Sequence, residues 1–287
     1  MGYVWNRVDP DELKPGDHIY TWRAAFTYAH HGIYVGGNKV IHFTSDQENA
    51  KSDVGIGRNA KSDVGIGWNL SSSLPIPSSC LNSSSLNSSC LNPIDCGFPQ
   101  HNCDSGSCLC TYDCGFHQPE SGVTLSCLNC FSRTGSLYLY QYGVNKWVHM
   151  SRIRGGICTV KPSNPPQAVI YRAIYLLGEE KGFGDYNVAR NNCEDFALYC
   201  KTELMIDGKL ATGGSGQVNS ILNAPWKPAL VQMFQKVVFR TPMTPLDVAA
   251  MVGRYTWDRY KTDIGVRGDV IRVLVEDVGA FRLERGY

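Results

Sequence analysis

The chain has 287 residues, an apolar content of 43% and a formal net charge of +1 at pH 7. These values allow one large domain or two small ones with a sizeable core. The near-zero charge argues against a nucleic-acid binder that depends on bulk charge. No window of about 18 residues is continuously apolar, so no transmembrane helix is expected. The N-terminal segment lacks a signal-peptide apolar run, which favours a cytoplasmic protein without a disulfide framework.

The first 45 residues predict compact β structure. The expected strands are residues 17–22, 30–35 and 39–43. Gly36-Gly37-Asn38 is a good hairpin turn between the last two. Side chains alternate along a strand, so His31 shares a face with Ile33 and Val35, and His30 takes the opposite face. The neighbouring histidines therefore point in opposite directions, and at most one of them belongs to a given site.

Residues 46–133 differ in character from what precedes them. The segment 49–58 is repeated almost letter for letter immediately afterwards, and a Ser/Asn-rich, low-complexity tract follows at 69–92. An unstructured run of this length is unusual inside a compact domain. We therefore interpret 46–133 as an insertion into a domain formed by residues 1–45 and 134–210.

Regular structure is predicted again after the insertion. Strands are expected at 137–142 and 156–160, a helix from Pro165-Pro166 to Gly178, a second helix from about Asn192, and a strand or buried extended run at 270–275. Residues 211–287 are predicted to form a helical extension, with helices near 230–240 and 246–260.

One helix of this extension has two interpretations. It has an apolar face and several basic residues: Trp226, Leu230, Phe234 and Val238, with Lys227, Lys236 and Arg240. Such a helix either contacts a membrane surface or packs on the core of the domain.

Cys193 is the first candidate for chemistry. It follows two asparagines that are good helix caps, so the thiol is expected in the first turn of a helix. The N–H groups and the dipole there favour an anion, which lowers a cysteine pKa, and they can stabilise an oxyanion during acyl transfer. The alternative is a small buried core residue, which is how we interpret Cys158 and Cys200.

Two histidines complete a possible nucleophilic site. An imidazole at His30 can take the thiol proton at neutral pH and later protonate a leaving group. His42 lies on the neighbouring predicted strand, close enough to hydrogen-bond His30 and fix its tautomer. The alternative is that both histidines are structural.

Three segments together resemble one known family. The segments are His30 to Gly36, Val40 to Phe43 and Asn192 to Phe196, and their order and local context are similar to those of the lecithin:retinol acyltransferase (LRAT)-like family. Within it, the chain looks most like the plant NC-domain proteins, to which residues 127–131, 154–159 and 259–267 are also similar.

The resemblance implies a fold, a site and a reaction. The fold is an α+β, circularly permuted papain-like one, with an antiparallel sheet packed on helices. The site is Cys193 as nucleophile, His30 as base and His42 as its support. The reaction is acyl transfer from a glycerophospholipid through a cysteine thioester, to an acceptor that the sequence does not identify. No catalytic cofactor and no nucleic-acid partner are expected, and any membrane contact is expected to be peripheral. Two alternatives use the same fold: a cysteine peptidase or amidase, and a non-catalytic, zinc-containing membrane or protein adaptor.

The remaining cysteines form a second constellation. Nine of the 12 cysteines lie between Cys80 and Cys130. The pairs Cys110-x3-Cys114 and Cys127-x2-Cys130 are spaced for a structural zinc site. Cys108 or His117 are alternative ligands. Free thiols, or disulfides in an oxidising compartment, are the alternatives to metal binding.

Overall fold

The computed structural model describes residues 6–23, 27–45, 113–133, 135–152, 154–207, 214–222 and 244–285. The repeated segment, the Ser/Asn-rich tract, Cys110 and the amphipathic segment 226–240 lie outside these residues.

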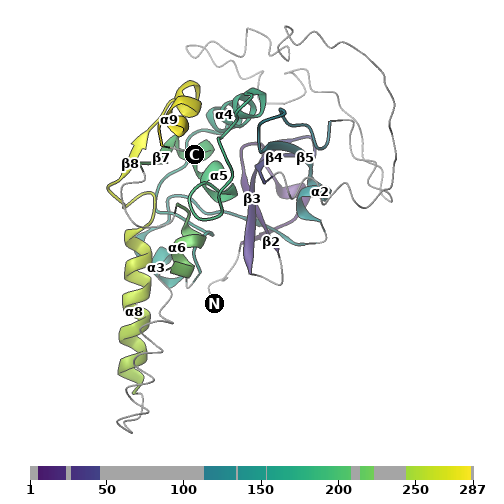
Figure 1. Ribbon diagram of the computed structural model, residues 1–287. Helices are drawn as coiled ribbons and strands as arrows, with labels where there is room; N and C mark the ends of the chain where they lie inside the picture. The colour runs from purple at the N-terminus through teal and green to yellow at the C-terminus, as the bar shows by residue number, and fades with distance from the viewer. Residues whose placement is uncertain are drawn as a thin grey trace, which may run out of the picture.

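The main sheet is antiparallel and six-stranded, with strand order β1-β6-β2-β3-β4-β5. Its strands are β1 (Arg7–Val8), β2 (His18–Arg23), β3 (Tyr28–Gly36), β4 (Lys39–Phe43), β5 (Val123–Cys127) and β6 (Leu137–Leu139). Figure 1 shows β2, β3, β4 and β5 of this sheet beside the helices. A separate pair, β7 (Leu204–Ile206) and β8 (Val270–Arg272), is also antiparallel. The predicted strand 39–43 is confirmed as β4, and the predicted strands at 17–22 and 30–35 correspond to β2 and β3.

The β3–β4 hairpin determines which residues of β3 are paired with β4. Gly36, Gly37 and Asn38 have φ values of 91°, 56° and 58°, as the predicted turn requires. The paired register runs from the turn to Gly32 opposite His42. Residues 28–31 of β3 extend beyond that last pair, so their backbone groups on the β4 side can bond to other parts of the chain.

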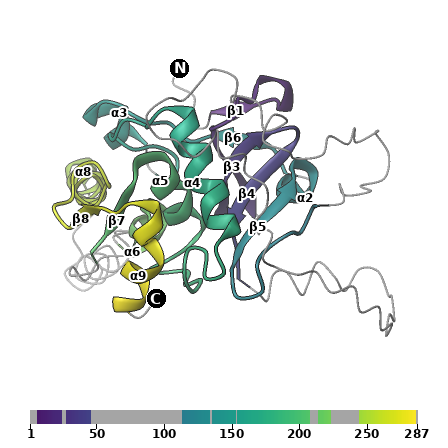
Figure 2. The same ribbon diagram turned by 90° about the horizontal axis from the view of Figure 1, so that it is seen from above.

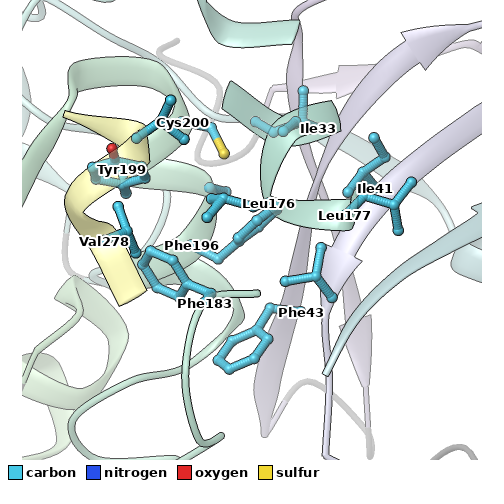
Figure 3. Close-up of a cluster of buried hydrophobic side chains, with 14 of the residues drawn as sticks. Ile33, Ile41, Phe43, Leu176, Leu177, Phe183, Phe196, Tyr199, Cys200 and Val278 are labelled. Carbon is cyan, nitrogen blue, oxygen red and sulfur yellow. The ribbon is translucent and has the colours of Figure 1, made fainter. Parts of the chain in front are cut away.

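Helices α4 (Pro166–Gly178) and α5 (Cys193–Thr202) cover one face of the sheet (Figure 2). The core between them contains Ile33, Ile41 and Phe43 from the strands, and Leu176 and Phe196 from the helices (Figure 3). Each of these side chains is no more than 1% exposed. Burial of this apolar surface is the main force that holds α5 against β3.

Helix α2 (Leu128–Ser132) lies on the other face of the sheet (Figure 2). Its Phe131 is buried against β3 and β4, and a Cβ at Gly32 would come within 2.9 Å of the Phe131 ring. Both β5 and α2 fall within the range 46–133 that the sequence assigned to an insertion. Because β5 pairs with β4 along its whole length, the end of that range is part of the sheet.

Residues 156–160 do not form the predicted strand. Gly156 has a φ of 77°, which interrupts an extended run, and only an isolated bridge joins Cys158 to Gln141. The preceding Gly155 lies so close to the start of helix α6, far along the chain, that a Cβ there would fall 2.2 Å from the Gly216 oxygen. The glycine pair thus serves close packing between backbones, which a hydrophobic pattern does not reveal.

The C-terminal region adds α6 (Gly216–Leu222), α8 (Pro245–Lys261) and α9 (Val278–Glu284). Three further short helices are α3 (Lys146–Ser151), which contacts α8, η4 (Val275–Asp277), which contacts α4, and η1 (Pro10–Glu12), which precedes β2. Figure 1 shows α8 as a long helix at the side of the molecule. Within the described ranges, no helix combines the length and apolar character needed to cross a bilayer.

Candidate active site

Cys193 is the first residue of α5 and lies against the open part of β3. The Asn192 side chain caps the helix by accepting hydrogen bonds from the N–H groups of Glu194 and Asp195, at 2.9 and 3.3 Å. The Cys193 sulfur lies 3.7 Å from the Ala29 carbonyl oxygen. The predicted placement of a thiol in a capped first helical turn is therefore what the structure shows.

The thiol does not have the lowered pKa that its place at the helix start predicted, and it is buried, as in the alternative interpretation. Cys193 is 1% exposed, and burial raises its pKa to about 12. Hydrogen bonds from the His31 backbone N–H and the Tyr186 hydroxyl favour the anion but do not outweigh burial. In addition, the Asn192 side chain occupies the N–H groups of Glu194 and Asp195, which are therefore not available to stabilise a thiolate. At rest, the site holds a neutral thiol.

The structure brings His30 and His42 together. His30 Nε2 and His42 Nδ1 are 3.0 Å apart, and His42 Nε2 is 2.8 Å from the Ser126 hydroxyl. Both imidazoles also contact the Phe131 ring, with centroid distances of 5.4 and 5.5 Å. Burial holds the pKa of His30 well below its usual value, so its imidazole is neutral. Ser126, on β5, is a member of this chain of hydrogen bonds that sequence reasoning missed.

The sulfur lies beside the backbone that carries His30, because its partners Ala29 and His31 flank that residue. Among the described residues, no hydrogen bond joins the Cys193 sulfur to the His30 imidazole. His30 Nε2 is engaged with His42, and Nδ1 is the ring nitrogen nearer the backbone.

A second pair of histidines lies on the other face of β3. His18 Nε2 and His31 Nδ1 are 2.9 Å apart, and His18 Nδ1 is 2.7 Å from the Tyr142 hydroxyl. Burial lowers the pKa of His31 to about 3. As the alternation of side chains predicted, His30 and His31 belong to different clusters.

Cys193 opens into a cavity of about 340 Å³. The apolar part of its wall consists of Tyr28, Tyr186, Val188, Val218 and Ile221. Its polar lining residues include Ser45, Asn192 and Gln217. The arrangement places one nucleophilic atom in the wall of a largely apolar pocket, which suits a reactive group on an apolar ligand.

Comparisons with known proteins identify the family of the chain. Residues 11–206 match the family described as lecithin retinol acyltransferase. The chain belongs to this family. It is also 38% identical over 284 residues to Protein LEAD-SENSITIVE 1 of Arabidopsis thaliana, an alignment that covers 97% of this chain and 90% of that protein. No solved structure matched the chain. The matched segment contains both histidines and the cysteine of the resemblance, and it ends before α6.

This member of the lecithin retinol acyltransferase family also has a cluster of thiols at the edge of its sheet. The sulfurs of Cys114, Cys127 and Cys130 all lie within 4.8 Å of one another, so the cluster can hold a metal ion. The Cys127 N–H donates to the Cys114 sulfur at 3.2 Å, and the Cys130 N–H to the Cys127 sulfur at 3.4 Å. Of the predicted ligands, Cys110 lies outside the described residues. Cys158 and Cys200 are buried at 3% and 0% exposure, as predicted for core residues.

Proposed function

We propose that this protein transfers acyl groups from glycerophospholipids through a thioester at Cys193, as an acyltransferase or a phospholipase. The observation that carries the proposal is the position of the Cys193 sulfur, which lies in the wall of an apolar cavity and beside the carbonyl of Ala29, the residue before His30. An acyl chain matches such a wall better than a peptide, whose amide groups would lose hydrogen bonds to water there.

The reaction consists of two half-reactions. His30 Nδ1 takes the proton of Cys193 as the sulfur attacks the ester carbonyl carbon, which forms a tetrahedral oxyanion. The intermediate collapses, the bond from the carbonyl carbon to the glycerol oxygen breaks, and the lysophospholipid leaves with the proton from His30. Water, an amine or an alcohol then attacks the thioester, and the sulfur leaves and regains a proton through His30. Because thiol and imidazole are both neutral at rest, proton transfer must accompany the attack.

We infer that the fold is circularly permuted relative to papain-like enzymes. In support, the histidine strands β3 and β4 precede the cysteine helix α5 in the chain, and α5 packs on the antiparallel sheet with its N-terminus at the histidine strand. The order His30, His42, Cys193 follows from that arrangement.

We also propose peripheral contact with lipid surfaces, from the cytoplasmic side. The cavity wall includes apolar residues that face solvent: Val188 is 71% exposed and Ile221 is 56% exposed. These side chains would enter the lipid interface and shorten the path of a phospholipid to the thiol.

A structural zinc ion is our proposal for the thiol cluster. Zinc takes four ligands in structural sites, and Cys114, Cys127 and Cys130 provide three of them. Backbone N–H groups donate hydrogen bonds to the sulfurs of Cys114 and Cys127 and hold them at the cluster. We assign the fourth position to Cys110.

The acyl-enzyme can be tested directly by mass. The purified chain is incubated with phosphatidylcholine vesicles, and its intact mass is measured beside that of Cys193→Ala. We expect an acyl-sized adduct on the unaltered protein alone, removable by hydroxylamine as a thioester is. The matched control is Cys200→Ala, which removes a buried thiol of the same helix and should still form the adduct. An adduct that persists in Cys193→Ala would rule out this nucleophile.

A further inference from the structure

Gln217 belongs to α6, outside the segment that matches the family. Its side chain nevertheless hydrogen-bonds to β3 where that strand extends beyond its pairing with β4. Gln217 Oε1 accepts a hydrogen bond from the Ala29 N–H at 3.0 Å, and Gln217 Nε2 donates to the Ala29 oxygen at 3.1 Å. The side-chain amide thus takes the place of a peptide group on the strand that is missing there. These two bonds also fix which amide atom is nitrogen.

Glu194 holds α6 in position from the residue next to the nucleophile. Its buried carboxylate accepts hydrogen bonds from the N–H groups of Gly216 and Gln217, both at 3.0 Å. The placement of Gln217 is therefore tied to α5 at one end and to β3 at the other. Because Gln217 is held by hydrogen bonds at both ends, its amide is already in place before a ligand binds.

The Gln217 amide and the Cys193 thiol are neighbours. Both hydrogen-bond to the same Ala29 oxygen, and both line the cavity. An amide nitrogen carries two N–H groups. Within the described part of the chain, the second N–H of Gln217 has no acceptor, and neither has the backbone N–H of Cys193. The Asn192 side chain occupies only the next two N–H groups of the helix.

We propose that Gln217 is a catalytic residue that stabilises the oxyanion, together with the Cys193 N–H. This inference rests on the proposed acyl transfer. When the sulfur bonds to the ester carbonyl carbon, the carbonyl π electrons move to the oxygen, which accepts hydrogen bonds from Gln217 Nε2 and the Cys193 N–H. When the carbon–oxygen bond to the leaving group breaks, the charge returns to a thioester carbonyl and both donors are released.

The test compares two reactions of the same sulfur in Gln217→Leu, which keeps a side chain of similar size without an N–H donor. The first is the rate of acyl-adduct formation with phosphatidylcholine vesicles. The second is the rate of alkylation by iodoacetamide, a displacement at a saturated carbon that forms no oxyanion. Removal of one oxyanion donor should slow acylation by roughly 10²- to 10³-fold. Alkylation should stay within about threefold of the unaltered protein, because the thiol and its base are retained.

Gln167→Leu, on α4 and outside the cavity wall, is the matched control and should leave both rates unchanged. Equal slowing of both reactions in Gln217→Leu would mean that Gln217 only supports the structure, and unchanged acylation would likewise overturn the inference. If the unaltered protein forms no adduct while Cys193 is alkylated normally, the proposed function fails, and the inference fails with it.

Discussion

Two neighbouring histidines on β3 each hydrogen-bond to a second histidine, on opposite faces of the sheet. The His30–His42 and His18–His31 pairs have similar Nε2–Nδ1 distances, 3.0 and 2.9 Å, and all four side chains are at least nine-tenths buried. The two pairs differ only in their position relative to the thiol and in the hydroxyl that bonds to each pair, from Ser126 in one and Tyr142 in the other. The protein thus contains a matched control for its own proposed base.

Loss of His42 should impair acylation much more than loss of His18. His42→Gln removes the partner that orients His30, so the acylation rate should fall by between about 10-fold and the roughly 10⁴-fold cost of replacing the orienting member of a triad. His18→Gln breaks the other pair and should change the rate by no more than about threefold. Both rates are measured by adduct mass and normalised to the folded fraction. The reverse ranking would assign the base to His31.

The sequence predicts the close residues of the site better than the distant ones. His30 and His42 follow from strand alternation and the register of one hairpin, both of which are local. Ser126 lies 84 residues from His42, and Gln217 lies 188 residues from Ala29. Cys193 is also distant, but a family motif identifies it, whereas no periodicity or motif identified Ser126 or Gln217. The raised pKa of Cys193 was missed for the same reason, because the burial that causes it comes from the tertiary fold.

At the scale of elements, the start of α5 carries both stability and chemistry. Asn192 accepts from two helix N–H groups, and its amide nitrogen donates to the Val188 oxygen at 2.8 Å and the Ser215 hydroxyl at 3.0 Å. The cap therefore also ties α5 to two loops, one of which leads into α6. Asn145 caps α3 with a single exposed hydrogen bond, to the Val148 N–H.

Asn192→Ala should destabilise the protein more than Asn145→Ala. Loss of a helix cap costs roughly 0.5–2 kcal/mol, and the buried partners of Asn192 lose further hydrogen bonds. We expect a loss of about 2 kcal/mol or more for Asn192→Ala and about 0.5–1 kcal/mol for Asn145→Ala, measured by urea unfolding. Equal losses would show that the buried bonds of Asn192 add nothing beyond the cap.

The predicted helices and strands are correct where the local sequence pattern and the tertiary packing favour the same structure. The helix at Pro166–Gly178 was expected from its prolines, its apolar face and its final glycine, and α4 has these bounds. The strand at 156–160 was expected from apolar residues alone. It is absent because Gly155 and Gly156 place the backbone against α6 and Glu194, a contact that is not encoded nearby in the chain.

At the scale of the whole molecule, the thiol cluster joins the segment before β5 to β5 and α2 at the edge of the sheet. Cys114 precedes β5, Cys127 ends it, and Cys130 lies in α2. Ser126 and Phe131, from the same short stretch, contact His42 and His30. A metal ion there would hold β5 and α2 together, and through them the support of the proposed base. The site and the thiol cluster therefore share β5 and α2.

Removal of zinc should loosen this edge of the molecule. We expect about one zinc ion per chain, as a single structural site requires, and its loss in a Cys127→Ser/Cys130→Ser variant. Because metal binding contributes directly to folding, the variant and chelator-treated protein should both melt at a lower temperature than the zinc-loaded protein. Zinc content is measured by elemental analysis and melting by differential scanning fluorimetry. Cys158→Ala is the control, since it removes a buried thiol outside the cluster and should keep the metal. Unchanged zinc content in the double variant would contradict the assignment.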